Sequence, residues 1–115
     1  QKTTRLLKER LGWKDTEIIT TFQSKFGPEE WLRPYTVEEV ARIVEEDKKK
    51  SIAVVAPAFS SDCIETLEEI NEEIRESFEE AGGEEFTYIP CLNDSPAHIS
   101  ALSSLIDQNL RGWID

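Results

Sequence analysis

The run SIAVVAP at residues 51–57 most constrains the fold, because it is apolar on successive residues. A strand with one face in water alternates apolar and polar side chains, whereas a central strand of a parallel sheet is apolar on both sides. We therefore expect residues 51–57 to form a strand that is covered on both faces. A helical pattern over 62–80 and a second strand pattern, EFTYIP at 85–90, follow it. This order predicts a right-handed β-α-β unit with parallel strands.

The segment 62–80 has the pattern of a long amphipathic helix. Its apolar residues recur every three or four positions and predict a core-facing stripe: Ile64, Leu67, Ile70, Ile74 and Phe78. Asp62 is a suitable N-cap residue for this helix. The glycine pair at 82–83 is expected to end it.

Further elements are predicted from periodicity, β-propensity and turn residues. They are a helix over 3–11, a strand over 17–23, a loop over 24–34, a helix over 37–47 and a helix over 96–109. Thr36 and Glu39 have the spacing of a capping box. Ser95 is expected to cap the last helix, with Pro96 as its first residue. The chain is thus predicted to contain three strands.

Strands that alternate with helices predict an α/β domain with a Rossmann-like or flavodoxin-like parallel sheet flanked by helices. A length of 115 residues fits one domain. In open parallel sheets, ligands bind beyond the carboxyl ends of the strands. Three segments leave those ends in the predicted order: residues 22–24, 58–63 and 91–94. We expect a functional site among them.

Charge and cysteine content exclude several classes of function. The net charge is −11, from 24 acidic and 13 basic residues, which argues against a nucleic-acid partner. No apolar run approaches the roughly 20 residues that span a bilayer. The two cysteines, Cys63 and Cys91, occur without a secretory pattern, and we expect a reduced, cytoplasmic protein.

The acidic side of the segment 62–80 is the first candidate for chemistry. Glu65, Glu69 and Glu73 are spaced by four residues, and each step of four turns an α-helix by only about 40°. Carboxylates in such a row suit a divalent cation. The same pattern is typical of a solvated helix face. No glycine-rich phosphate loop follows a predicted strand, and the sole histidine, His98, is expected to be structural or solvated.

Two stretches carry a resemblance that covers nearly the whole chain: FQSKFGPEEWLRPYT at 22–36 and the segment 57–99, which contains SSDCIETL. Both resemble ferrochelatase, the family that inserts ferrous iron into a porphyrin to form haem. The resemblance implies a chelatase-type half domain, one of two similar Rossmann-like halves. Residues 1–115 correspond to the C-terminal domain, a fragment of a longer two-domain chain. The family's catalytic histidine belongs to a motif absent here, so the isolated chain is expected to be inactive.

The resemblance also implies roles for individual residues. Glu65 is the active-site carboxylate, which binds metal or removes a pyrrole proton. The metal-binding set is Glu65, Glu69, Glu73 and Cys63. The residues that line the porphyrin are Trp31, Phe59, Gln23 and Ser24. Cys63 stands where other members carry histidine, and the alternative to a metal ligand is a buried structural thiol.

The resemblance implies that Fe²⁺ is a substrate, with protoporphyrin IX as its acceptor. We expect no permanently bound cofactor and no iron–sulfur cluster in this segment. The N-terminal half of the same enzyme is the implied partner, and peripheral membrane contact stays open. The alternatives are a cobalt or sirohaem-type chelatase domain and a non-enzymatic, flavodoxin-like acidic binding module.

Overall fold

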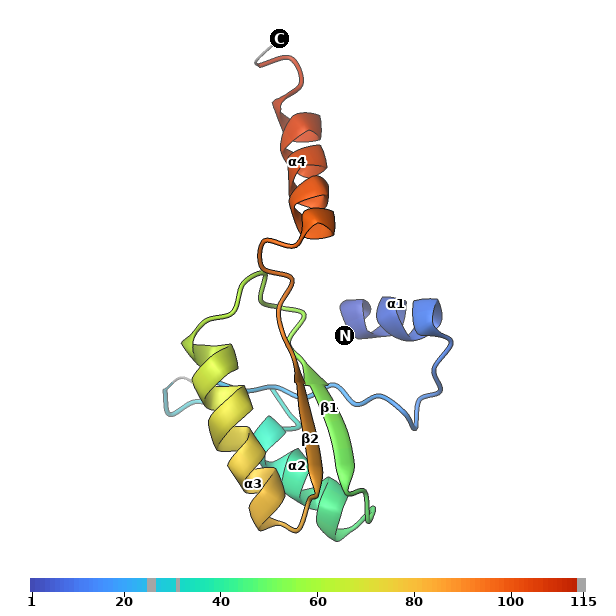
Figure 1. The fold of residues 1–115 in the computed structure, drawn as a ribbon, viewed down its shortest axis with the longest axis vertical. Helices are drawn as coiled ribbons and strands as arrows, with labels where there is room; N and C mark the ends of the chain where they lie inside the picture. Colours follow the sequence, from blue (N-terminus) through green and yellow to red (C-terminus); the bar gives the residue numbers. More distant parts are fainter. Residues whose placement is uncertain (25–26, 31, 114–115) are drawn as a thin grey trace.

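The structure, a computed structural model, describes residues 1–24, 27–30 and 32–113 (Figure 1). Its centre is a parallel pair of strands, β1 (Ser51–Val55) and β2 (Glu85–Ile89). The strands are joined by a helix in two parts. The first, η1 (Glu65–Ile74), is π-helical, and the second, α3 (Arg75–Glu80), is α-helical. The α/β class and the β-α-β order predicted from the sequence are confirmed.

Three further helices complete the described chain: α1 (Lys2–Leu11), α2 (Thr36–Glu45) and α4 (Pro96–Leu110). Helix α1 ends at Gly12, whose φ of 70° lies in the left-handed region that glycine adopts without strain. Pro96 occupies the first turn of α4, as expected from its fixed φ. None of the described helices combines the length and the apolar character needed to cross a bilayer.

The core lies between the sheet and two helical segments. Its buried residues come from α2, from η1 and α3, and from β2: Val40, Val44, Ile70, Ile74, Phe78 and Phe86. Ile52 and Val54 of β1 pack against this cluster. The rings of Phe78 and Phe86 lie 5.8 Å apart between centroids, in a tilted arrangement that aromatic pairs favour. Each buried side chain of this size stabilises the fold by about 1.5–3 kcal/mol.

The strand predicted over 17–23 is wrong. In this segment only Phe22 makes a bridge, to Tyr35, through hydrogen bonds from Phe22 N to Pro34 O and from Thr36 N to Phe22 O, both 2.9 Å. Pairing stops there because Pro34 has no N–H to donate and α2 begins at Thr36. The sheet of the described residues therefore has two strands.

The expectation that both faces of the first sheet strand are covered is also wrong. Burial alternates along β1, and Val55 keeps 47% of its surface exposed. Helices α2 and α3 cover the face that carries Ile52 and Val54, and no described element covers the other. Two residues of the predicted helix stripe also lie outside the core, Ile64 at 72% exposure and Leu67 at 50%. They precede the part of the helix that crosses the sheet.

The predicted helix caps differ from the observed ones. Thr36 is the first residue of α2 rather than its cap, and its hydroxyl donates to Thr21 Oγ1 over 2.8 Å. Glu39 accepts from Arg42 Nε at 3.0 Å instead of closing a capping box. Ser95 stands at the N-cap position of α4, but its side chain makes no capping hydrogen bond.

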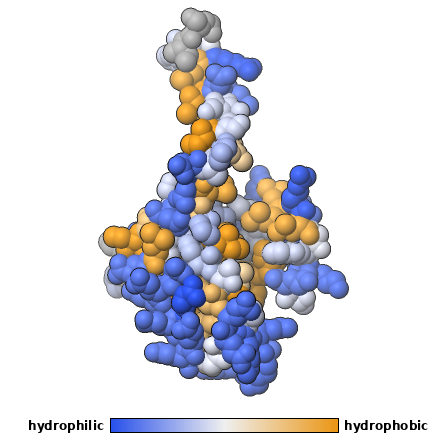
Figure 2. Space-filling model, viewed as in Figure 1, coloured by the Kyte–Doolittle hydropathy of each residue, from blue (hydrophilic) through white to orange (hydrophobic). Residues whose placement is uncertain are grey.

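Helix α4 projects away from the rest of the molecule (Figure 1). None of its residues is buried. Its apolar side chains are exposed along its length, as the orange surface in Figure 2 shows: Ile99, Leu102, Leu105, Ile106 and Leu110. This extension gives a radius of gyration of 17.0 Å, compared with about 13 Å for a compact domain of 100 residues.

We predict that Gly83→Ala destabilises the chain through the core aromatic pair. A Cβ at Gly83 would lie 2.3 Å from Phe78 Cε1, so the ring would have to move. Overpacking of this kind costs about 1–3 kcal/mol. Urea unfolding of the 1–115 chain should show that loss, and a smaller one in a Phe78→Leu background. An equal loss in both backgrounds would contradict the steric explanation.

Candidate functional site

The loops that follow the two strands meet at one edge of the sheet. The backbone N–H of Asn93, in the loop after β2, donates to the carbonyl of Ser60, in the loop after β1, over 3.0 Å. Asn93 has a φ of 49°, in the left-handed region that asparagine tolerates better than most residues. The start of η1 lies at this same edge. The geometry expected for parallel strands is therefore present, with two strand ends in place of three.

Asp62 is the most heavily hydrogen-bonded side chain at this edge. Its Oδ2 accepts from Asn93 Nδ2 at 2.8 Å, and its Oδ1 accepts from Thr66 Oγ1 at 2.9 Å and from the Tyr88 hydroxyl. These donors, Tyr88 first, hold the pKa of Asp62 well below its usual range. Burial and the bond to Asp62 raise the pKa of Tyr88. Asp62 is thus not the predicted helix cap, because its oxygens are taken by side chains of three other segments.

Glu65 is the first residue of η1 and lies beside Cys63. The Cys63 thiol donates to the Glu65 carboxylate and, together with the backbone N–H of Glu65, lowers its pKa. The backbone carbonyl of Glu65 accepts from Gln23 Nε2 at 2.8 Å. Gln23 therefore contacts the main chain of the residue predicted to be catalytic. The structure brings Gln23, Cys63 and Glu65 together.

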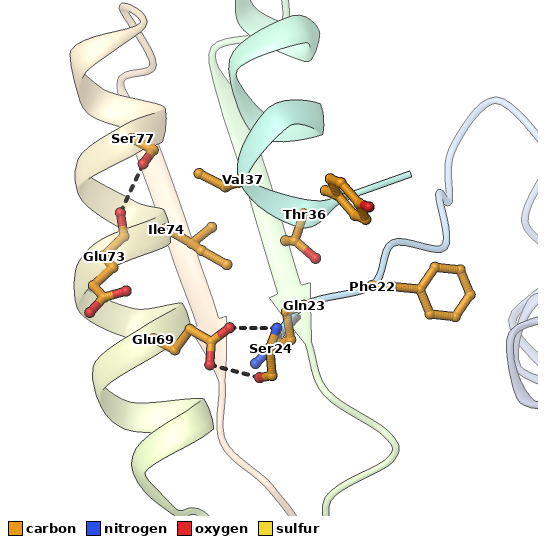
Figure 3. Close-up of a pocket in the computed structure, with 10 residues that line it drawn as sticks. Phe22, Gln23, Ser24, Thr36, Val37, Glu69, Glu73, Ile74 and Ser77 are labelled. Carbon is orange, nitrogen blue, oxygen red and sulfur yellow. Dashed lines mark hydrogen bonds between the residues drawn. The ribbon is translucent and has the colours of Figure 1, made fainter. Parts of the chain in front are cut away.

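Glu69 binds Ser24 with both carboxylate oxygens. Its Oε1 accepts from the Ser24 backbone N–H and its Oε2 from the Ser24 hydroxyl, both at 2.7 Å (Figure 3). Ser24 has a φ of 58°, which is uncommon for a residue with a Cβ. The two charge-assisted bonds hold this turn against η1. Glu69 thus anchors the loop that follows Phe22.

Glu73 diverges from Glu69. Figure 3 shows the Glu69 carboxylate pointing toward Ser24 and the Glu73 carboxylate pointing the opposite way. A spacing of four residues slightly exceeds one turn of an α-helix but falls short of one turn in a helix with i→i+5 bonds. A step of four residues along η1 therefore turns slightly backward instead of slightly forward, and the two carboxylates separate because their side chains extend in different directions. Both side chains still border a pocket of about 390 Å³, whose other walls include Phe22, Val37 and Ile74.

The other predicted site residues are distributed around this edge. Phe59 is half-buried in the loop after β1. Trp31 lies outside the described residues. His98, predicted to be structural or solvated, bonds through Nδ1 to the carbonyl of Asn93 at 2.6 Å and through Nε2 to Ser60 Oγ at 2.9 Å. His98 therefore joins the two strand-end loops.

The predicted metal ligands do not form one centre. In the described part of the chain, no three side chains of the types His, Cys, Asp and Glu are gathered closely enough to hold a metal ion. Cys63 contacts Glu65, whereas Glu69 is bound to Ser24. Cys63 and Cys91 are both free thiols, and burial raises the pKa of Cys91. The structure thus offers separate carboxylates rather than a preformed metal cage.

Sequence reasoning missed three members of the site: Thr66, Tyr88 and Asn93. Thr66 is fully buried, and its hydroxyl accepts from Cys63 N at 2.9 Å and contacts Asp62. Tyr88 reads in the sequence only as an inward strand residue. Asn93 carried a weak signal, since it lies in a segment that follows a strand. Polar residues that follow adjacent parallel strands are the pattern that could have paired Asn93 with Asp62.

The sequence matches a known protein family. A family model described as Ferrochelatase matches residues 1–110. The chain belongs to the ferrochelatase family. The match includes every described site residue, from Gln23 to His98.

Curated relatives extend the comparison. The chain is 68% identical over its full length to a ferrochelatase of Rhodobacter capsulatus, of which it covers 32%. It is 58% identical over 97% of its length to a ferrochelatase of Marinobacter nauticus, of which it covers 30%. A ferrochelatase of Rhizobium meliloti is 54% identical over 99% of the chain, with 33% of the relative covered. The chain thus spans about a third of the length of the curated ferrochelatases it matches.

We predict that Glu69→Gln loosens the loop at Ser24. The substitution removes the charge from both hydrogen bonds and places an amide donor against one of the two donors of Ser24. Charge-assisted bonds contribute about 1.5–3 kcal/mol, so the Ser24 amide should exchange its hydrogen about tenfold faster or more. Glu73→Gln is the matched control, because its carboxylate has no hydrogen bond to a described residue. Equal exchange in the two variants would contradict the anchoring role.

Proposed function

We propose that the chain is the C-terminal part of a ferrochelatase that inserts ferrous iron into protoporphyrin IX. Its membership of the family and its high identity to curated ferrochelatases support this. In the reaction, Fe²⁺ replaces two pyrrole N–H protons, so haem and two protons are the products. Iron is a substrate here, and we propose no permanently bound cofactor and no iron–sulfur cluster in this segment.

The observation that carries the proposal is the setting of Glu65. A general base must be ionised at the working pH and held at a fixed place. The Cys63 thiol and a backbone N–H lower the pKa of Glu65, which favours its charged form. Gln23 holds its main chain over 2.8 Å. We propose that Glu65 receives a pyrrole proton or binds the incoming metal.

The metal set is proposed as a series of contacts rather than as one cage. Glu73 is exposed and free to attract a hydrated cation. Glu69 joins the series only if a cation displaces Ser24 from its oxygens. Cys63 supplies a thiol next to Glu65, in the position implied for a metal ligand by the resemblance. Metal that follows this order ends at Glu65.

The porphyrin surface is proposed to include Phe59, Gln23, Ser24 and Trp31. Flat apolar side chains suit a macrocycle, and Phe59 belongs to the loop that leads to Glu65. Gln23 and Ser24 follow Phe22 on the facing segment and are tied to η1. Trp31 is included on the resemblance alone.

The partner proposed for this chain is the remaining part of the enzyme, which would complete a Rossmann-like sheet and supply the basic partner of Glu65. The uncovered face of β1 and β2 supports this, because Val55 and Ile89 are exposed there. We propose a cytoplasmic location, which the two free thiols support. Peripheral contact with a membrane surface remains part of the proposal.

We predict that Glu65→Gln in the full-length enzyme slows metal insertion by about 10²–10⁴-fold, the usual contribution of a positioned general base. Glutamine keeps the shape of the side chain but neither accepts a proton nor carries charge. The rate is measured by the loss of porphyrin fluorescence as iron or zinc enters. Glu68→Gln, on an exposed side of the same helix, is the matched control and should keep the parent rate. An unchanged rate in Glu65→Gln would refute the proposed site.

We predict that the 1–115 chain alone does not catalyse insertion, because it supplies one side of the site only. The same fluorescence assay applies, with the full-length enzyme as the positive control. Turnover by the isolated chain would show that its own carboxylates are sufficient, and would overturn the requirement for a second half.

A further inference from the structure

We propose that Asp62 and Asn93 form a positioning clamp, which joins the two strand-end loops and fixes the main chain from which Glu65 presents its carboxylate. Neither residue belongs to the proposed set that touches metal or porphyrin. The inference rests on the proposed function, because it takes Glu65 as the reacting carboxylate. It adds to the proposed site two residues that influence the reaction without touching iron or porphyrin.

The clamp consists of two reciprocal hydrogen bonds. The Asp62 backbone N–H donates to Asn93 Oδ1 over 2.9 Å, and Asn93 Nδ2 donates to Asp62 Oδ2 over 2.8 Å. The backbone N–H of Asn93 also donates to Ser60 O over 3.0 Å. These three bonds, and a longer one of 3.5 Å from Cys91 N to Asp62 Oδ1, cross between the loop after β1 and the loop after β2. The Asn93 amide both accepts, with Oδ1, and donates, with Nδ2, and the bond that it donates is strengthened by the charge of the Asp62 carboxylate.

A second set of bonds transmits this fixation to Glu65. The other oxygen of Asp62 accepts from the hydroxyl of Thr66, which is fully buried, and from Tyr88. Thr66 Oγ1 accepts from Cys63 N at 2.9 Å, and Thr66 N donates to Cys63 O over 3.2 Å. Glu65 thus lies in the chain between Thr66, which is bonded to Asp62, and Cys63, which is bonded to Thr66 and directly follows Asp62.

His98 closes the network from α4. With its Nδ1–H donating to the Asn93 carbonyl, its Nε2 accepts from the Ser60 hydroxyl. The asparagine is then held by its side chain, its N–H and its carbonyl at once. These bonds restrict the movement of Asn93 relative to the loop after β1. A displacement of about 1 Å at a reacting group costs on the order of 100-fold in rate, which makes such fixation consequential.

The test is an exchange of the two side chains in the full-length enzyme. In Asp62→Asn, one amide oxygen must serve either Asn93 Nδ2 or the Thr66 and Tyr88 hydroxyls, so the other side is left facing an NH₂ group; in Asn93→Asp, two carboxylates face each other. In the double variant D62N/N93D, the carboxylate introduced at position 93 accepts from the backbone N–H and from the new side-chain amide of position 62, so the pair and its net charge are restored. We expect each single variant to lower kcat for metal insertion by about 100-fold, with the KM for porphyrin unchanged, and the double variant to recover most of that loss.

The matched control is Asp94→Asn, which removes the same charge from the adjacent, exposed residue and should retain the parent kcat. All rates are referred to the fraction of enzyme that binds porphyrin, so a loss of folded protein does not count as a loss of kcat. If a single variant does not fold, Tyr88→Phe removes one donor to Asp62 without a change of shape, and it should also lower kcat at an unchanged porphyrin KM.

The outcomes separate the clamp from the proposed function. Single variants that match Asp94→Asn, or a folded double variant as slow as the singles, would overturn the clamp. A kcat that returns to the parent value once it is referred to folded enzyme would reduce the pair to a structural role and also overturn it. If Glu65→Gln loses activity while Asp62→Asn and Asn93→Asp keep the parent kcat, the clamp is refuted and the proposed function is not. Normal activity in Glu65→Gln refutes the proposed site itself.

Discussion

The parallel pairing of β1 with β2 is the constraint on which the rest of the structure depends. Parallel strands require a crossover, and here the crossover is η1 and α3. Their buried residues Ile70, Ile74 and Phe78 hold that crossover against one face of the sheet. Because both strands point the same way, the loops that leave them emerge at one edge, where η1 also begins. Every described residue of the candidate site is within or bonded to these three segments.

Much of this arrangement could be predicted from local patterns. The apolar run at 51–57 and the stripe that contains Ile70, Ile74 and Phe78 are properties of the sequence itself, and they determine the order of elements and the core. The strand expected at 17–23 failed because a strand also needs a neighbour, which no local pattern contains. In the described chain, the only β-bridge of this segment joins Phe22 to Tyr35. The double-sided burial expected for β1 failed for the same reason, since a covering layer must come from outside the strand's own segment.

The candidate site was predictable in its residue types and only partly in its contacts. The glutamates and Cys63 stand out in the sequence because of their spacing and their resemblance to a family motif. The spacing of four predicts that Glu69 and Glu73 lie one turn apart, but it does not predict that Glu69 binds Ser24 while the Glu73 side chain points away from it. The pairing of Asp62 with Asn93 joins residues 31 positions apart. Such a pairing follows from strand order and register, which become known only with the fold.

The hydrogen-bond donors around each carboxylate divide the acidic residues by function. A carboxylate with donors on both oxygens is a weak base and a reluctant metal ligand, because a proton or cation must first displace those donors. Asp62 and Glu69 are in that state, so they are suited to hold the chain in place. Glu65 has the Cys63 thiol and its own N–H as partners, and a thiol is a weak donor that yields readily. Charge alone therefore does not select the reactive carboxylate. For Glu65, which we propose as the reacting carboxylate, the difference from Asp62 and Glu69 is the weak donor beside it, and an acidic helix face read from sequence does not display that difference.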